Sequence, residues 1–214
     1  MAKVKGKQAW HTRWYVGLAA ALVLILGVVM LLFTGTPVDR LRTFHIPAGS
    51  MIPTILIDDY IAALMPAAPQ AAIRPCEIAV FKKPGSPDKP EVDYVKRVVA
   101  VAGDHVAYVA GRLRLNGELV PREKIRVEGS TTIFRETLPN GCSYLIQDMR
   151  DGSPLDDVEE IVVPPGHFYG LGDNRDDSLD SRAPVIGPIP DENYRARPFI
   201  VYWAKDWHRI GTLL

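Results

Sequence analysis

The sequence predicts a mainly β fold behind a single N-terminal transmembrane helix. An uncharged apolar run occupies residues 14–33, whereas beyond residue 36 the apolar residues come in short groups separated by Gly, Pro and Asp. The 18 Pro and 17 Gly among 214 residues favour many turns and short strands over a helical bundle. We therefore expect a basic tail at 1–13, a membrane helix at 14–33 and a β-rich domain at 34–214.

The apolar run reads WYVGLAAALVLILGVVMLLF and would span about 30 Å as a helix, enough to cross the hydrocarbon core of a bilayer. Four basic residues precede it, which predicts a cytoplasmic N-terminus and places the β-rich domain on the extracytoplasmic side of the membrane. A cleaved secretory signal is the alternative, but the run is longer than a usual signal core and no A-x-A site follows it. A single-pass anchor is favoured.

The strands of the β-rich domain are predicted from short apolar groups that contain many β-branched and aromatic residues. Asn116-Gly117 indicates a hairpin, because both residues accept the positive φ of a type I′ turn. Between residues 121 and 160 the pattern weakens, and residues 148–160 hold six acids and one arginine, typical of a solvated face. We expect an inserted sub-domain there. The predicted strands are 77–83, 94–102, 105–110, 112–120, 143–147, 159–166, 167–172 and 198–204.

Charge and cysteine content narrow the classes of function. The 25 basic residues balance the 25 acidic ones, so no basic excess is available to neutralise phosphates and a nucleic-acid partner is not expected. The C-x-x-C and H-x-x-H spacings of redox and zinc sites are absent, and we expect neither metal nor cofactor. Cys76 and Cys142 either form one disulfide in an oxidising compartment or remain thiols, and the sequence leaves both possibilities open.

Two segments suggest a serine nucleophile and a lysine base. In FHIPAGSMIPTI, residues 44–55, prolines stiffen the chain while Ala48 and Gly49 let another backbone approach the Ser50 hydroxyl. A plain Gly-Ser turn would explain this pair alone. In YVKRVVAVAGD, residues 94–104, Lys96 lies within an otherwise apolar strand. It either snorkels at a strand edge or, when desolvated, loses its proton readily enough to act as a general base.

A third segment, GDNRDDSLDSR at residues 172–182, mixes acids, Asn and Ser with two arginines. A calcium loop is excluded by spacing, because a loop that began at Asp173 would have Arg175 at its third position and no Glu at its twelfth. A series of Asx turns would not explain the arginines. The mixture favours a rigid, ion-paired support.

Together the three segments resemble the signature boxes of bacterial type I signal peptidases, membrane-anchored serine proteases. SMIPT at 50–54 matches the serine box, YVKRV at 94–98 with Gly103-Asp104 the lysine box, and 172–182 the G-D-N-R-D-x-S-x-D-S-R box. The resemblance covers about residues 43–117 and 164–204, and it implies a β-rich signal-peptidase-like catalytic domain. Implied partners are the bilayer and signal peptides of exported preproteins, cut after small residues of A-x-A type.

The resemblance also implies a role for each matching residue. Ser50 would be the nucleophile, and Lys96 the general base that leads to an acyl-enzyme. Ser178 would orient the lysine amine. Asp180 and Arg182 would form a supporting ion pair, and Asp173 and Arg175 would hold the loop. A substrate strand would lie against shallow pockets lined by Phe44, Ile46, Pro47, Met51, Tyr94 and Val95.

Two departures from the family pattern stand out. Ala48 replaces a hydroxyl residue that often contributes to the oxyanion hole, which leaves the Ser50 N–H as the one donor we can name. After Arg182, APVIGP replaces the more usual aromatic-Gly continuation. The alternatives are a conjugation-type pilin-processing peptidase and an inactive, membrane-tethered peptide-binding relative. A self-cleaving repressor shares the Ser–Lys pair but lacks the anchor, and a His-based hydrolase would need a G-x-S-x-G elbow that is absent.

Overall fold

The structure, a computed structural model, describes residues 18–19, 21–27, 29, 40–67, 73–83, 92–150 and 152–214. The chain divides into two compact units, Met1–Arg40 and Leu41–Leu214. Residues 18–19, 21–27 and 29 are helical, while the predicted tail 1–13 and part of the predicted span 14–33 lie outside the described residues. No helix in the described ranges has the length and apolar character that a membrane crossing requires.

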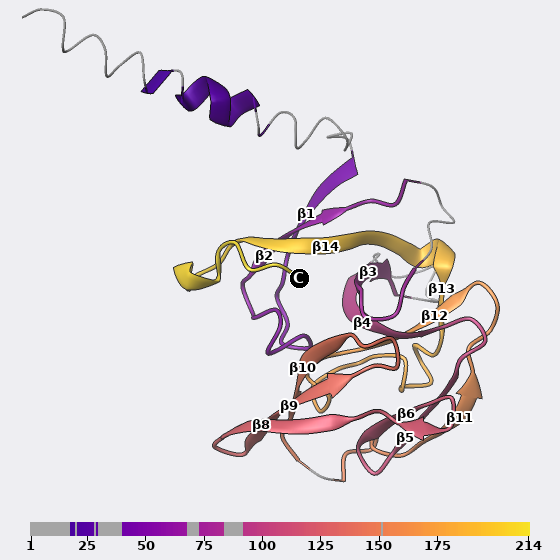
Figure 1. Cartoon of the computed structure of the whole chain (residues 1–214). Helices are drawn as coiled ribbons and strands as arrows, with labels where there is room; N and C mark the ends of the chain where they lie inside the picture. Colours follow the sequence, from indigo (N-terminus) through magenta and orange to yellow (C-terminus); the bar gives the residue numbers. More distant parts are fainter. Residues whose placement is uncertain are drawn as a thin grey trace, which may run out of the picture. The chain divides into compact units, whose positions relative to one another are not determined.

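The unit Leu41–Leu214 is mainly β, as predicted, and its largest sheet has seven strands (Figure 1). Every strand pair in it is antiparallel, and β4 is paired with β3 on one side and β12 on the other. In sheet order the strands are β1 (Leu41–His45), β2 (Tyr60–Leu64), β14 (Tyr194–Trp203), β3 (Ile78–Lys82), β4 (Asp93–Val101), β12 (His167–Leu171) and β13 (Ile189–Pro190).

Two smaller antiparallel sheets are built from the chain between β4 and β12 (Figure 1). The first contains, in sheet order, β11 (Val158–Val162), β5 (His105–Val109), β6 (Arg112–Leu115) and β7 (Glu118–Leu119). The second contains β10 (Ser143–Asp148), β9 (Thr131–Thr137) and β8 (Arg122–Glu128). Because β11 pairs with β5, the stretch 121–160 shares a sheet with residues outside it, and its separation as a sub-domain stays a prediction. Short 3-10 turns cover Asp191–Asn193 and Trp207–Arg209.

Each apolar group that predicted a strand contains one, with small shifts at the ends. The expected strand 112–120 is divided into β6 and β7 by a turn in which Asn116 has φ 51° and Gly117 φ 86°. Leu115 pairs with Glu118 across it, so the predicted tight hairpin is confirmed. Five of the described strands were not predicted: β1, β2, β8, β9 and the two-residue β13 (Ile189–Pro190). In β8, REKIRVE, few apolar side chains are available to mark the period of two.

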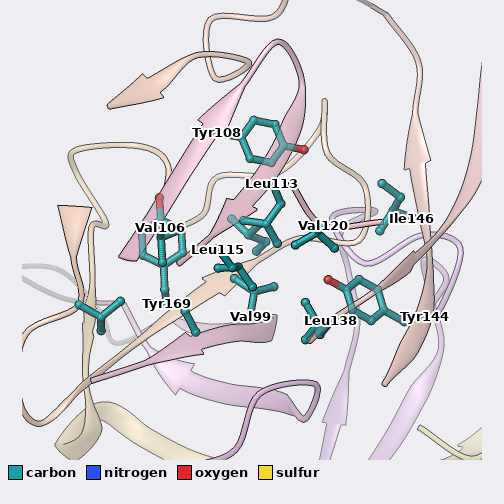
Figure 2. Packing of buried hydrophobic residues seen from close by; sticks show 13 residues of the cluster. Val99, Val106, Tyr108, Leu113, Leu115, Val120, Leu138, Tyr144, Ile146 and Tyr169 are labelled. Carbon is teal, nitrogen blue, oxygen red and sulfur yellow. The ribbon is translucent and has the colours of Figure 1, made fainter. Parts of the chain in front are cut away.

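One apolar core joins the large sheet to the two smaller ones (Figure 2). It takes Val99 from β4, Tyr169 from β12, Leu113 from β6 and Ile146 from β10, each no more than 2% exposed. A fully buried aliphatic side chain contributes about 1.5–3 kcal/mol relative to the exposed state. Residues that lie far apart in the chain are therefore fixed beside the large sheet that carries Lys96.

A disulfide joins Cys76 to Cys142 across 66 residues of sequence. Cys76 precedes β3, and Cys142 lies in the turn between β9 and β10, so the bond connects the large sheet to the three-stranded sheet. A crosslink that closes a loop of this length restricts the unfolded chain, and the chain-entropy estimate of its stabilisation is about 4 kcal/mol.

We therefore expect Cys142→Ser to lower the free energy of unfolding of the β-rich unit by about 4 kcal/mol. Denaturant unfolding followed by tryptophan fluorescence measures this change. The double variant Cys76→Ser/Cys142→Ser is the matched control and should unfold at nearly the same denaturant concentration as the single variant. An unchanged midpoint in both variants would contradict the expected crosslink.

Candidate active site

Ser50 lies in a turn that follows β1. Ile46 N–H donates to the Asp59 carbonyl at 2.9 Å, and Asp58 N–H donates back to the Ile46 carbonyl at 2.8 Å, which aligns the segment with the start of β2. Met51, 1% exposed, belongs to an apolar cluster with Ile46 and other buried residues. Burial of the side chain after Ser50 holds the turn and leaves Ser50 half-buried.

The backbone at Ser50 is also held from the far end of the sequence. Asn174 N–H donates to the Ser50 carbonyl at 3.0 Å, and its side-chain Nδ2 donates to the Gly49 carbonyl at 3.1 Å. A side chain at Gly49 would crowd the turn, because its Cβ would lie 3.0 Å from Ile52 Cδ1. The predicted close approach of another backbone to this serine is therefore present, and Asn174 makes it.

Lys96 extends from the interior of β4 and is 3% exposed. Its Nζ donates a hydrogen bond to Ser50 Oγ at 2.8 Å and another to the Val95 carbonyl at 3.0 Å. The amine lies 5.4 Å from the centre of the Tyr94 ring, as expected for residues two apart on one face of a strand. The lysine is therefore buried beside the serine and does not snorkel to a strand edge.

Burial lowers the pKa of Lys96 from 10.5 to about 8, against the opposing attraction of the Asp180 and Asp173 carboxylates. Desolvation penalises the protonated amine more than the neutral one, so a sizeable fraction of the side chain is neutral near physiological pH. A neutral amine at hydrogen-bond distance from a hydroxyl can accept its proton. No hydrogen bond joins Ser50 to a histidine in the described part of the chain.

Two glycines next to the serine–lysine pair were not predicted to matter. A Cβ at Gly172 would lie 2.1 Å from Ser178 Oγ and 2.6 Å from the Ser50 carbonyl oxygen, and neither distance is possible. At Gly170 it would lie 3.1 Å from Lys96 Cβ. Both positions therefore let the end of β12 pass close behind the pair. Both glycines belong to the sequence Gly-Leu-Gly at 170–172. From the sequence, this tripeptide indicates only the end of a strand and the first residue of the 172–182 motif.

Asp180 and Arg182 form the predicted ion pair, in which both side chains are fully buried. Arg182 Nε and Nη2 each donate to the Asp180 carboxylate at 2.9 Å, and Gly172 N–H donates to it at 3.0 Å. Burial alone would raise the pKa of Asp180, but the Arg182 charge and these hydrogen bonds lower it below its usual value. The pair thus fixes the backbone of Gly172 beside Ser50.

Asp173 and Arg175 support the loop through partners that were not predicted. Asp173 receives two hydrogen bonds from Arg97, at 2.8 and 2.7 Å, and one from Thr54. Arg175 donates to both carboxylate oxygens of Glu136, at 3.0 and 2.6 Å. Arg97 follows the catalytic candidate Lys96 directly, which could have been a signal. Glu136 belongs to a charged strand in which no pattern distinguished it.

One expected polar contact, from Ser178 to the Lys96 amine, is not formed among the described residues. Ser178 is 8% exposed, and its hydroxyl lies close enough to Asp180 to help lower the pKa of that carboxyl, but it makes no hydrogen bond to the Lys96 amine that it was expected to orient. The Ser50 N–H has no acceptor in the described part of the chain, so it is available to a substrate oxygen. Ala48 is exposed and has no side-chain donor that could assist it.

The altered continuation after Arg182 packs well despite its departure from the usual pattern. Ala183 and Ile186 are 7% and 5% exposed. Ile186 packs in an apolar cluster with Phe168 and Ile189, next to β12. The segment therefore supports β12, which ends at Leu171.

A groove of about 320 Å³ contains Ser50 and Lys96 in its wall. All six residues predicted to contact substrate line it, and so do Asp177 and Leu179 of the loop 172–182, which we did not predict. Most of the wall is apolar or backbone, which suits small apolar side chains of an extended peptide. The lining residues are Phe44, His45, Ile46, Pro47, Ala48, Gly49, Ser50, Met51, Val92, Asp93, Tyr94, Val95, Lys96, Asp177 and Leu179.

Residues 12–203 match the peptidase S26 family, described as signal peptidase. The chain belongs to this family. Relatives include the signal peptidase I of Pseudomonas aeruginosa, 31% identical over 79% of this chain and 67% of the relative. The signal peptidase I of Rickettsia canadensis is 30% identical over 81% and 78%, and that of Aquifex aeolicus 28% identical over 76% of each chain.

Among solved structures, a signal peptidase I from Enterococcus faecalis V583 is 20% identical to this chain. The match covers 59% of this chain and 96% of that one, with a TM-score of 0.37. Membership of the signal peptidase family therefore rests on the sequence match over residues 12–203.

Proposed function

We propose that this chain is a membrane-anchored signal peptidase that cuts preproteins with a Ser50–Lys96 dyad. The observation that carries the proposal is the hydrogen bond of 2.8 Å between the buried amine and the serine hydroxyl, at the wall of an apolar groove. Family membership supports proteolysis of signal peptides, and the lowered pKa of Lys96 supports its use as a base.

In the first half of the reaction, Ser50 Oγ attacks the carbonyl carbon of the scissile bond while Lys96 Nζ takes the hydroxyl proton. The Ser50 N–H donates to the oxygen that becomes negative. Collapse of the tetrahedral intermediate breaks the C–N bond, and the new amine takes the proton from Lys96. The product is an acyl-enzyme with an ester at Ser50.

Water completes the reaction by the same proton path. Lys96 takes a proton from water, the hydroxide attacks the ester carbonyl, and Ser50 Oγ leaves with that proton. The loop 172–182 serves this cycle by positioning: Asp180 with Arg182 and Asp173 with Arg97 hold Gly172 and Asn174, which fix the Ser50 backbone. In the proposal Ser178 takes no part in the proton transfers.

The substrate would lie as an extended strand in the groove, with small side chains in the shallow pockets formed by Phe44, Ile46, Pro47, Met51, Tyr94 and Val95. An anchor at 14–33 would hold the enzyme in the inner membrane, with its groove on the extracytoplasmic side. The Cys76–Cys142 disulfide supports that side, because disulfides persist in oxidising compartments.

The test is cleavage by the full chain in detergent of preproteins whose signal ends in A-x-A, with the cut mapped by mass spectrometry. We expect a single cut after the second small residue, and replacing either alanine by a bulky residue should lower kcat/KM. A single extra methylene in a pocket changes rates about 10–200-fold, and larger residues should do more. Saturable peptide binding without cleavage would favour the inactive peptide-binding relative. Cleavage of pilin precursors alone would favour the conjugation-type pilin-processing peptidase.

A further inference from the structure

The loop 172–182 contains one acid that its own architecture does not use. Asp173 and Asp180 bind arginines, and Asp176 accepts hydrogen bonds from Met149 N–H at 2.6 Å and Arg150 N–H at 3.2 Å. Asp177 is exposed and has no hydrogen bond or ion pair to another described residue. Three acids of this loop therefore stabilise it, whereas the carboxylate of the fourth, Asp177, is not used in this way.

The backbone of the loop places Asp177 in the wall of the groove. Burial alternates along the loop, so that Ser178 and Asp180 are buried while Asp177 and Leu179 are exposed and line the groove. Asp177 lies between two anchored neighbours, Asp176 and Ser178, so its backbone is held where substrate would pass. The carboxylate needs little reorganisation to meet a charged group there.

Apart from the lysine of the dyad, the fully charged side chains that line the groove are negative. Besides Lys96 and His45, the lining residues with an acidic or basic side chain are Asp93 and Asp177, and no arginine lines the groove among the described residues. The groove therefore attracts a cation more than an anion. Asp93 stands opposite Lys82 in the β3–β4 register, whereas Asp177 faces no such partner there.

We infer that Asp177 is a specificity-determining residue that favours substrates with a lysine or arginine near the scissile bond. The inference rests on the proposed peptidase function and adds to it a substrate feature beyond small residues. Asp177 does not contribute noticeably to the environment of the Lys96 amine, whose charged neighbours are Asp180, Asp173 and Arg182. It would therefore act through substrate binding and leave the proton transfer unaltered.

The experiment varies one residue at a time in a peptide that contains an A-x-A site. At each position on either side of the cut, matched peptides carry Lys, Glu or the neutral Gln. At the position that meets Asp177, kcat/KM for the Lys peptide should exceed that for the Glu peptide roughly two- to fivefold, the range of exposed ion pairs. The ratio should fall with added salt, because the pair is screened.

The variants decide the assignment. Asp177→Asn should abolish the preference and Asp177→Lys should invert it in favour of Glu, while the exposed acid Glu159, outside the groove, is the matched control as Glu159→Gln. Equal kcat/KM for Lys and Glu peptides at every position, or a preference that survives Asp177→Asn, would overturn the inference. Failure to cut even the Gln peptide would instead contradict the peptidase function.

Discussion

Ser50→Ala and Lys96→Met are each expected to lower kcat at least about a thousandfold, because each removes one half of a nucleophile–base unit. The two losses should not add: the double variant should be about as slow as either single variant, since neither residue works without the other. Single-turnover cleavage of an A-x-A peptide measures this.

The controls separate chemistry from folding. Ser130→Ala and Lys124→Met change exposed residues of β8 and the turn after it, and both should keep wild-type kcat. The thermal midpoint of Ser50→Ala should stay near that of the wild type, because Ser50 is only half-buried. Lys96→Met replaces a buried amine by an apolar chain of similar length, which removes a desolvation penalty. Wild-type-like cleavage by either active-site variant would refute the dyad.

Gly172→Ala should have the second largest effect, with kcat lowered at least about a hundredfold and KM changed little. The added methyl would lie 2.1 Å from Ser178 Oγ and 2.6 Å from the Ser50 carbonyl oxygen. The backbone at one of these residues must shift, and a displacement near 1 Å between the reacting groups costs about that much in rate. Steady-state kinetics with the same peptide measure both constants.

Two other glycines provide a graded comparison. Gly170→Ala should cause a smaller loss, since its Cβ would lie 3.1 Å from Lys96 Cβ, a contact that slight movement relieves. Gly129→Ala has open space but φ +61°, so it should lower stability while leaving kcat unchanged. Wild-type kcat for Gly172→Ala would show that the close packing behind Ser50 does not matter for the reaction.

Ser50 and Lys96 could be predicted as a pair because each differs in chemical type from its neighbours in the sequence. A lysine among valines in a strand, and a serine between small residues and prolines, stand out against their neighbours. The groove residues could be predicted from the family resemblance, and all six line one cavity with the pair. Most strands of the large sheet followed from apolar groups, since a sheet buried on one face needs them.

The support of the site could be predicted only in part, because its partners come from distant segments. Asp180 and Arg182 are two residues apart and were paired correctly, whereas Arg175 pairs with Glu136 across 39 residues and Asp173 with Arg97 across 76. No local pattern indicates which buried acid meets which arginine. Gly172 was quoted as part of a motif, but its role depends on the close approach of Ser178 and Ser50, which only the fold creates.

The proposed reaction depends on a neutral amine at Lys96, and NMR titration of its Nζ or Cε in the full chain measures this most directly. The signal is assigned by its loss in Lys96→Met. We expect a midpoint near pH 8, because burial lowers the pKa to about 8. The amine is neutral above that pH, so kcat/KM should rise with pH through the same midpoint. A midpoint near the ordinary lysine value of 10.5 would contradict the use of Lys96 as the base for Ser50.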